Sequence, residues 1–405
     1  MALTIEKMDF RKTKLIYIIL FLLVFMNKLT TIYVFSQMEF LGTVIDFVQV
    51  PMYGGLIYII VQKKYSLKEL MAFLVIGILL LVGYVISGQA AYFKGFLLII
   101  ASKNIPYRRI LNVCRKALTF VLGLGIFLFL TGISNSGISR RGASGLGFGH
   151  PNVTAQLIMI IILLWVSEKA GKLKPVHYIG IELGGLITFL LTDSKTSTIV
   201  ILLIPLVMVF SEKIMSRTWY SKVPKFLMTY SQLLVMLFTY LSARFLETSN
   251  MLKTLDLVFT NRLFLNYYVL NKFGIKLFGQ NVTLSDNSGT IYNNIHGWYN
   301  WSVTCDCSYM VTLLVMGLIP TVIILIGYIL LMKKAIKRHN YMIMSVALLL
   351  AIYSFCESQM LEVYSSFVYF YLIADDIVLD DFKAKDYNQK HIMKNLVRTI
   401  GSLKQ

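Results

Sequence analysis

Long apolar stretches constrain this chain more than any other feature of its sequence. Only 15% of the 405 residues are charged, against roughly 25% in soluble globular proteins. A run of about 20 apolar residues crosses a bilayer as one helix, so the sequence predicts an all-α polytopic membrane protein with about twelve transmembrane helices. The predicted spans lie near residues 15–36, 40–62, 70–87, 89–102, 116–133, 151–167, 177–193, 195–211, 226–243, 307–332, 341–357 and 361–378. The span at 89–102 is short and contains Lys94, so we expect it not to cross fully.

The net charge of +19 is explained by where the basic residues lie. Twelve spans put both termini on one side, and if that side is the cytoplasm, most of the 39 Lys and Arg residues are cytoplasmic. This bias follows the positive-inside rule, so no nucleic acid is expected as a partner. The N-terminal apolar run lacks a cleavage pattern and is predicted to be the first span. The four cysteines are too scattered for a disulfide framework and lack zinc-site spacing.

Two predicted outside loops interrupt this plan within a single integral membrane domain, 1–405. The first, 134–150, is Gly-rich and polar. The second, 244–305, is predicted to be a large extracytoplasmic loop whose short helices cap an outward-facing cavity. Its first half has Leu263, Tyr267 and Leu270 at helical spacing, which predicts a helix lying on the membrane. The segment 379–405 is predicted to be a cytoplasmic amphipathic tail.

Several cations lie on the outer side against the positive-inside trend, mostly in these two loops. Arg offers a planar fork to phosphate oxygens, and Lys serves as a point charge. A cluster of them can stabilise a departing diphosphate without a metal ion. Contact with anionic lipid headgroups is the alternative for any one of them. The candidates are Arg140, Arg141, Lys195, Arg244 and Arg262.

The candidate proton acceptors and sugar contacts lie on the same side. Of the five histidines, His150 and His296 are outside, one in each unusual loop. Trp298 and Trp301 stand among asparagines, which suits the flat apolar face and polar edge of a sugar ring. An aromatic belt at the membrane interface is the alternative reading.

Two intramembrane charges invite a simple explanation. Lys28 in the first predicted span and Asp46 in the second lie at similar inferred depth. We expect them to form a structural ion pair, with a proton or ion relay as the functional alternative.

The chain resembles a known family in four motifs that occur in the same order. Arg140-Arg141 followed by residues 147–152 (GFGHPN) is similar to the Arg-then-GFxHPN element of Wzy-type bacterial polysaccharide polymerases, members of the O-antigen polymerase and ligase superfamily. Residues 193–196 (DSKT) look like its Ser-Arg/Lys-Thr turn. Arg262 before residues 277–279 (LFG) resembles its Arg ahead of an LFG turn. Residues 306–309 (DCSY) look like its Asp-Asn-x-Tyr motif.

The chain departs from the family pattern at several motif positions. Lys195 stands where Arg is common, Asn261 where Gly is frequent, and Cys307 in place of Asn. In the ligase branch a histidine occupies about the place of Asp306. The carboxylate therefore favours a polymerase over a ligase.

The resemblance implies a bacterial cytoplasmic-membrane glycosyltransferase that is GT-C-like, metal-independent and without a cofactor. Such an enzyme joins undecaprenyl-diphosphate-linked oligosaccharide repeats at the outer face, in capsule, exopolysaccharide or O-antigen synthesis. The five candidate cations on the outer side would hold the diphosphate, and Asp306, His150 or His296 would be the base, with Asp306 preferred. Asn152 and Tyr309, from the motifs, join Trp298 and Trp301 as sugar contacts.

Partners and competing functions follow from the same reading. Besides the lipid-linked oligosaccharide and membrane lipids, a flippase and a chain-length regulator of the same export pathway are expected partners. The alternatives are a ligase-like glycan transferase and, from a different class, a flippase or transporter of lipid-linked oligosaccharide. A flippase should show internal repeats and charge along a central pathway.

Overall fold

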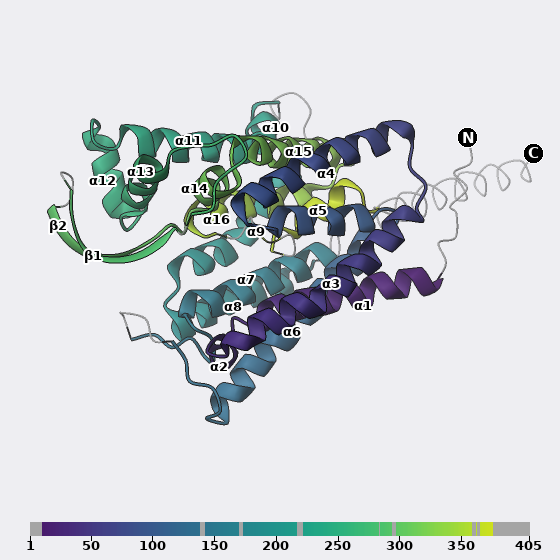
Figure 1. Ribbon diagram of the computed structural model, residues 1–405, viewed down its shortest axis with the longest axis horizontal. Helices are drawn as coiled ribbons and strands as arrows, with labels where there is room; N and C mark the ends of the chain where they lie inside the picture. The colour runs from purple at the N-terminus through teal and green to yellow at the C-terminus, as the bar shows by residue number, and fades with distance from the viewer. Residues whose placement is uncertain are drawn as a thin grey trace, which may run out of the picture.

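The computed structural model describes residues 10–137, 142–169, 173–216, 222–282, 284–293, 297–358, 362 and 365–375. Helices dominate this part of the chain, with one two-stranded sheet (Figure 1). The elements are α1 (Phe10–Leu29), α2 (Tyr33–Ser36), α3 (Glu39–Val61), α4 (Leu67–Ser87), α5 (Ala91–Ala101), α6 (Tyr107–Leu130), α7 (Pro151–Glu168), α8 (Pro175–Thr192), α9 (Lys195–Ser216), α10 (Lys222–Thr229), α11 (Ser231–Phe245), α12 (Asn250–Val258), α13 (Arg262–Phe273), β1 (Ser285–Asn293), β2 (Gly297–Thr304), α14 (Ser308–Val311), the π-helix η1 (Thr312–Met316), α15 (Leu318–Lys337), α16 (Tyr341–Cys356) and the 3-10 helix η3 (Phe367–Leu372).

Several helices are long and apolar enough to cross a bilayer, which makes this an all-α polytopic membrane protein. Among the described residues seven helices meet the length and composition, namely α3, α4, α6, α7, α8, α9 and α15. The pair α10 and α11 makes an eighth if its 62° bend lies within one span. With eleven residues, α5 rises only about 16 Å. That length agrees with the expectation that 89–102 does not cross fully.

The predicted twelfth span, 361–378, is wrong as a continuous helix over its described residues. Those residues form a turn and the six-residue helix η3. A 3-10 helix of this length rises about 12 Å, far less than the roughly 30 Å of a hydrocarbon core. The segment is apolar because it is buried: Phe367, Phe370 and Tyr371 are almost fully covered by protein. A buried core segment and a span have the same composition.

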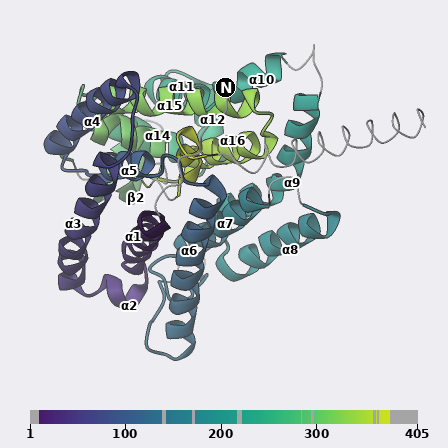
Figure 2. The ribbon, with the colours of Figure 1, turned by 90° about the vertical axis from the view of Figure 1, so that its right-hand side faces the viewer.

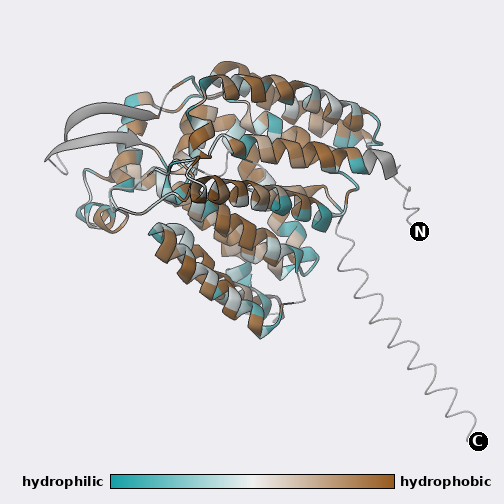
Figure 3. Ribbon diagram, turned by 90° about the horizontal axis from the view of Figure 1, so that it is seen from below, coloured by the Kyte–Doolittle hydropathy of each residue, from teal (hydrophilic) through white to brown (hydrophobic). Residues whose placement is uncertain are grey.

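The helices form two layers. Helices α3, α1, α6, α7 and α8 lie side by side in one layer, and α9 and α16 connect it to a second layer with α11 and α15 (Figure 2). Helix α7 is the interior member, with 67% of its span buried, against 17% for α4. The outer helices carry exposed apolar residues, such as Phe47 at 79% exposure and Val85 at 75%. Polar residues gather at helix ends (Figure 3). An apolar exterior of this kind is suited to lipid.

Glycines allow two motif segments to pack backbone against backbone. A Cβ on Gly279 would lie 1.9 Å from the Val315 carbonyl oxygen, and one on Gly317 would lie 2.0 Å from the Gly279 nitrogen. Both residues also have positive φ, 81° and 91°. The LFG turn and the break between η1 and α15 are therefore interlocked, which explains their glycines by packing rather than by chemistry.

The large loop 244–305 is mostly ordered structure. A helix is confirmed over Arg262–Phe273, with Leu263 and Leu270 buried and Tyr267 half-buried. The second half, which the sequence described only as polar and aromatic, forms the antiparallel hairpin β1–β2. The hairpin, α12 and α13 lie together at one end of the molecule (Figure 1). The predicted tail, 379–405, lies outside the described residues.

Candidate functional site

Arg262 is held in place by the start of its own helix. Both Leu263 and Phe264 donate backbone hydrogen bonds to Oδ1 of Asp256, at 2.8 and 3.1 Å. Asp256 is fully buried, so α13 has a fixed N-terminus. The preceding Asn261 has a left-handed φ of 64°, which lets the chain turn sharply from α12 into α13. Arg262 is thus the first helical residue, and its side chain extends toward the end of α16.

The Arg262 guanidinium is bound by two oxygens from the end of α16. Its Nη1 donates to the Cys356 carbonyl, and its Nη2 lies 3.3 Å from Oε1 of Glu357. The two ionised side chains are only 16% and 13% exposed. Ion pairs shielded to this degree are costly to break from one side, because the remaining charge stays buried. Glu357 is a site residue that the sequence reasoning missed.

Asp306 completes a cluster of charges with Arg262 and Glu357. Burial raises the pKa of Asp306, while the nearby Arg262 and His150 charges lower it. Ser308, two residues on, donates from its hydroxyl to the Glu357 carbonyl, which ties this segment to the end of α16. We call Arg262, Asp306, Glu357 and His150 the acid–arginine cluster.

Glu357 has an unusual acidity within this cluster. Burial raises its pKa to about 7, although Arg262 opposes the shift, and the neighbouring Asp306 charge adds to it. A carboxyl group with a pKa near neutrality exchanges protons readily at physiological pH. Perturbed carboxyls of this kind mark functional-site candidates.

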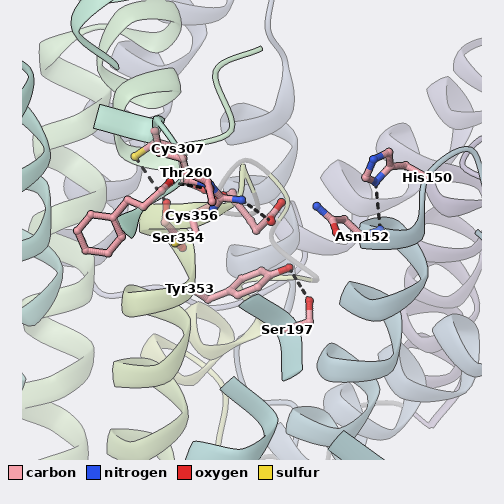
Figure 4. Close-up of polar contacts among 12 residues, drawn as sticks. His150, Asn152, Ser197, Thr260, Cys307, Tyr353, Ser354 and Cys356 are labelled. Atoms are coloured by element: carbon pink, nitrogen blue, oxygen red, sulfur yellow. Dashed lines mark hydrogen bonds and ion pairs between the residues drawn. The ribbon is translucent and has the colours of Figure 1, made fainter. Parts of the chain in front are cut away.

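His150 lies across from this pair, at the start of α7. Its Nδ1 accepts a hydrogen bond of 3.1 Å from the Asn152 backbone N–H, so the ring caps the helix (Figure 4). The cap uses Nδ1, which leaves Nε2 as the ring nitrogen that can meet a substrate. The ring is exposed. It is therefore suited to meeting a substrate while its backbone position is held by the cap.

The other sequence-predicted residues divide into three groups. Lys195 is exposed in the first turn of α9, where Ser197 shares a 3.2 Å hydrogen bond with the Tyr353 hydroxyl; this turn lies beside the last turn of α16 (Figure 4). Arg244 is exposed at the end of α11 and takes part in none of the described cluster contacts. Arg140, Arg141 and His296 lie outside the described residues, as do the side chains of Trp298 and Trp301 in β2.

Tyr309 does not have the position expected of a sugar contact. It is 1% exposed, and its hydroxyl donates to the Ala351 carbonyl at 2.7 Å. The structure therefore places Tyr309 in the core between α14 and α16, where a sugar ring does not reach it. Asn152, in contrast, is half-buried beside His150.

A cavity of about 860 Å³, with Asp46, Gln49 and Lys94 in its lining, lies between α1, α3, α4 and α5, next to Glu362. The predicted Lys28–Asp46 pair is wrong in its partners: Lys28 pairs with Glu362 at 2.6 Å, and Asp46 pairs with Lys94 at 3.7 Å. Lys28 is 6% exposed, so its partner had to come from a segment folded against it.

Among the described residues, no group of three or more His, Cys, Asp or Glu side chains is close enough to share a metal ion. Comparison of the chain with family models, with curated proteins and with solved structures found no match. The geometry of the acid–arginine cluster must therefore carry the functional argument.

Proposed function

We propose that this protein is a membrane glycosyltransferase that polymerises oligosaccharide repeats carried on a polyprenyl diphosphate. The observation that supports it most is the convergence of two carboxyls, one arginine and one histidine from four separate segments of the chain. Transfer from a lipid diphosphate needs such a set: a cation for the leaving group and a base for the acceptor. The positive-inside bias of the sequence supports an outer-face position for this end of the helices.

Atoms and electrons balance in this transfer reaction with these residues alone. An acceptor hydroxyl loses its proton to a carboxylate, and its oxygen forms a bond to the anomeric carbon of the donor sugar. The bond from that carbon to the diphosphate oxygen breaks, and the diphosphate leaves with the electron pair. Arg262 stabilises the charge that develops on the leaving group. Glu357 or Asp306 accepts the proton, and the Nε2–H of His150 donates to a substrate oxygen.

The Arg262–Glu357 contact suggests how the site is loaded. An incoming diphosphate competes with Glu357 for the guanidinium, because phosphate oxygens accept the same fork of donors. A carboxylate released from its cation binds protons more strongly, since Arg262 is the charge that lowers its pKa. Substrate binding thus strengthens the base at the moment that it is needed.

The direct test uses purified protein reconstituted with lipid-linked repeat units. We expect ladders of extended glycan on a gel, and none with Arg262→Gln that is inserted and folded. The double variant Lys333→Gln/Lys337→Gln, two exposed residues at the far end of α15, is a matched control and should give normal ladders. If folded wild-type protein leaves the single repeats unextended, the proposal is rejected.

A second candidate is translocation of the same lipid-linked glycan, which the charged residues in the cavity beside Glu362 favour. Inside it, Lys94 donates a 3.3 Å hydrogen bond to the side-chain oxygen of Gln49. Intramembrane charges facing a cavity often mark a transport path. Vesicles with substrate in one leaflet separate the two: movement to the other leaflet without extension supports transport, whereas extension in the starting leaflet supports polymerisation.

A further inference from the structure

A second charged region lies at the opposite end of α7 from His150. A cavity of about 640 Å³ is lined there by residues of α1, α6 and α7. Helix α7 runs from Pro151 to Glu168, which separates its ends by about 27 Å. This region, which we call the cationic cavity, is therefore distinct from the acid–arginine cluster and does not rest on the function proposed above.

The cationic cavity contains more basic than acidic side chains. Its lining includes Arg108, Arg109, Arg115 and Lys169, with Glu168 as the acid. Both oxygens of Glu168 are occupied by Arg115, at 2.7 and 3.2 Å, and Asn112 also donates to one of them. Glu168 therefore balances Arg115. No ion pair within the described chain balances Arg108, Arg109 or Lys169.

The position of these cations is unfavourable without a ligand. Arg108 and Arg109 stand in the first turn of α6, where the helix dipole is already positive, and no acidic residue lies in that turn. The phenol oxygen of Tyr17, which lines the same cavity, is buried and lies near the Arg109 guanidinium. An anion in the cavity would offset the repulsion among these cations.

The chemistry of the lining identifies the kind of anion. Guanidinium groups match the oxygens of a phosphate with paired hydrogen bonds. The volume is within the range of small-ligand sites and exceeds that of one phosphate. Basic pockets between transmembrane helices also bind phosphate-bearing lipid headgroups. We propose that the cationic cavity binds a phosphate-bearing anion, supplied either by a lipid headgroup or by a soluble phosphate compound.

Binding there would hold three helices together. Arg108 and Arg109 belong to α6, Lys169 ends α7, and Tyr17 belongs to α1, and these helices are neighbours. A ligand that binds only the folded state raises stability in proportion to the logarithm of its concentration over its Kd. The site is thus predicted to report its occupancy through the melting temperature.

The test measures melting of purified full-length protein in non-ionic detergent with three probes: sodium pyrophosphate, cardiolipin micelles and neutral phosphatidylcholine micelles. We expect cardiolipin, pyrophosphate or both to raise Tm, and phosphatidylcholine not to. A rise with cardiolipin alone assigns the ligand to lipid, and a rise with pyrophosphate assigns it to soluble phosphate chemistry. Failure of both anionic probes overturns the proposal.

Variants then locate the effect. Arg108→Gln/Arg109→Gln should weaken binding of the active probe at least tenfold, whereas Lys333→Gln/Lys337→Gln, at the same end of the bundle but outside the cavity, should not. Equal loss of probe binding in both double variants, or no loss in Arg108→Gln/Arg109→Gln, overturns the assignment of the site to this cavity. If Arg108→Gln/Arg109→Gln fails to fold, Arg108→Lys/Arg109→Lys is the second variant. It keeps both charges but removes the paired donors of the guanidinium groups, so it should weaken binding of the probe by a smaller factor. An unchanged affinity there also counts against the proposal.

Discussion

The two ends of α7 hold basic residues in opposite situations. At the His150 end, Arg262 is bound by a carbonyl and a carboxylate, and the chain supplies its own counter-charge. At the Glu168 end, Arg108, Arg109 and Lys169 face a cavity with one acid, which Arg115 already occupies. A count of cations does not separate these regions. The source of the counter-charge does: at one end the chain supplies it and burial raises the pKa of two carboxyls, and at the other end we propose that an external anion supplies it.

The largest expected effect is on catalysis at the charge-balanced end. Replacement of Glu357 by Gln, or of Asp306 by Asn, keeps the shape but removes a proton acceptor. If one of them is the base, its loss should slow chain extension by about 10²- to 10⁴-fold. Initial rates of extension, measured on protein whose melting is checked separately, identify which one it is. Rates within a few-fold of wild type for both would remove the carboxyls from the mechanism.

Arg262→Gln should cost the most stability. It leaves Glu357 buried without its cation, and breaking one side of a shielded pair costs about 3 to 5 kcal/mol. Because loss of Arg262 raises the pKa of Glu357 further, the penalty should be smaller in acid, where the carboxyl is neutral, and larger in base. Denaturation midpoints on either side of neutrality check this sign. A penalty independent of pH would mean that the pair is not electrostatically coupled.

The stability of the wild-type protein should depend on pH through the titration of Glu357. Its folded pKa of about 7 lies above the ordinary value of 4.5. The folded state therefore binds more protons between these values, so this group's contribution to stability is present in acid and is lost as pH rises through about 7. If Glu357 is the base, activity rises over the same interval. Melting and extension rates across this range test both, and Glu357→Gln should flatten the stability change.

The smallest effect is expected at the cationic cavity in the absence of ligand. Arg108→Gln/Arg109→Gln removes cations that have no acidic partner in the described chain, so the free energy of unfolding should change by less than about 1 kcal/mol. The direction should be toward stability, since repulsion is relieved. Melting in lipid-free detergent provides the measurement. A loss as large as that of Arg262→Gln would show that the two ends do not differ in the way described.

The residue types and their predicted side of the membrane indicate part of the acid–arginine cluster. Asp306, His150 and Arg262 were each chosen from the sequence, and the structure brings them within electrostatic reach of one another. Glu357 has no predicted role because it falls at the end of the predicted span 341–357. It lies 95 residues from Arg262, and nothing local marks it as a partner. A charged residue directly after an apolar helix on the predicted outer side was the available signal.

Partner choice was the weakest part of the prediction. Lys28 and Asp46 were matched by depth, yet Lys28 pairs with Glu362, which follows the last long helix by six residues, and Asp46 pairs with Lys94 of α5. Likewise Tyr309 was assigned to sugar binding from its motif, although it is buried against Ala351. Sequence spacing reports depth and side, but not the rotation of one helix against another.

The sequence by itself determined that this chain enters a membrane, because the free energy of burying apolar runs depends on composition and length alone. Tertiary structure decided which charges meet. A buried ion needs a partner within a few ångströms, and that partner comes from whichever segment the packing of helices brings near. The end of α16 and the start of α13 are close only in the folded chain, and the acidity of Glu357 exists only there.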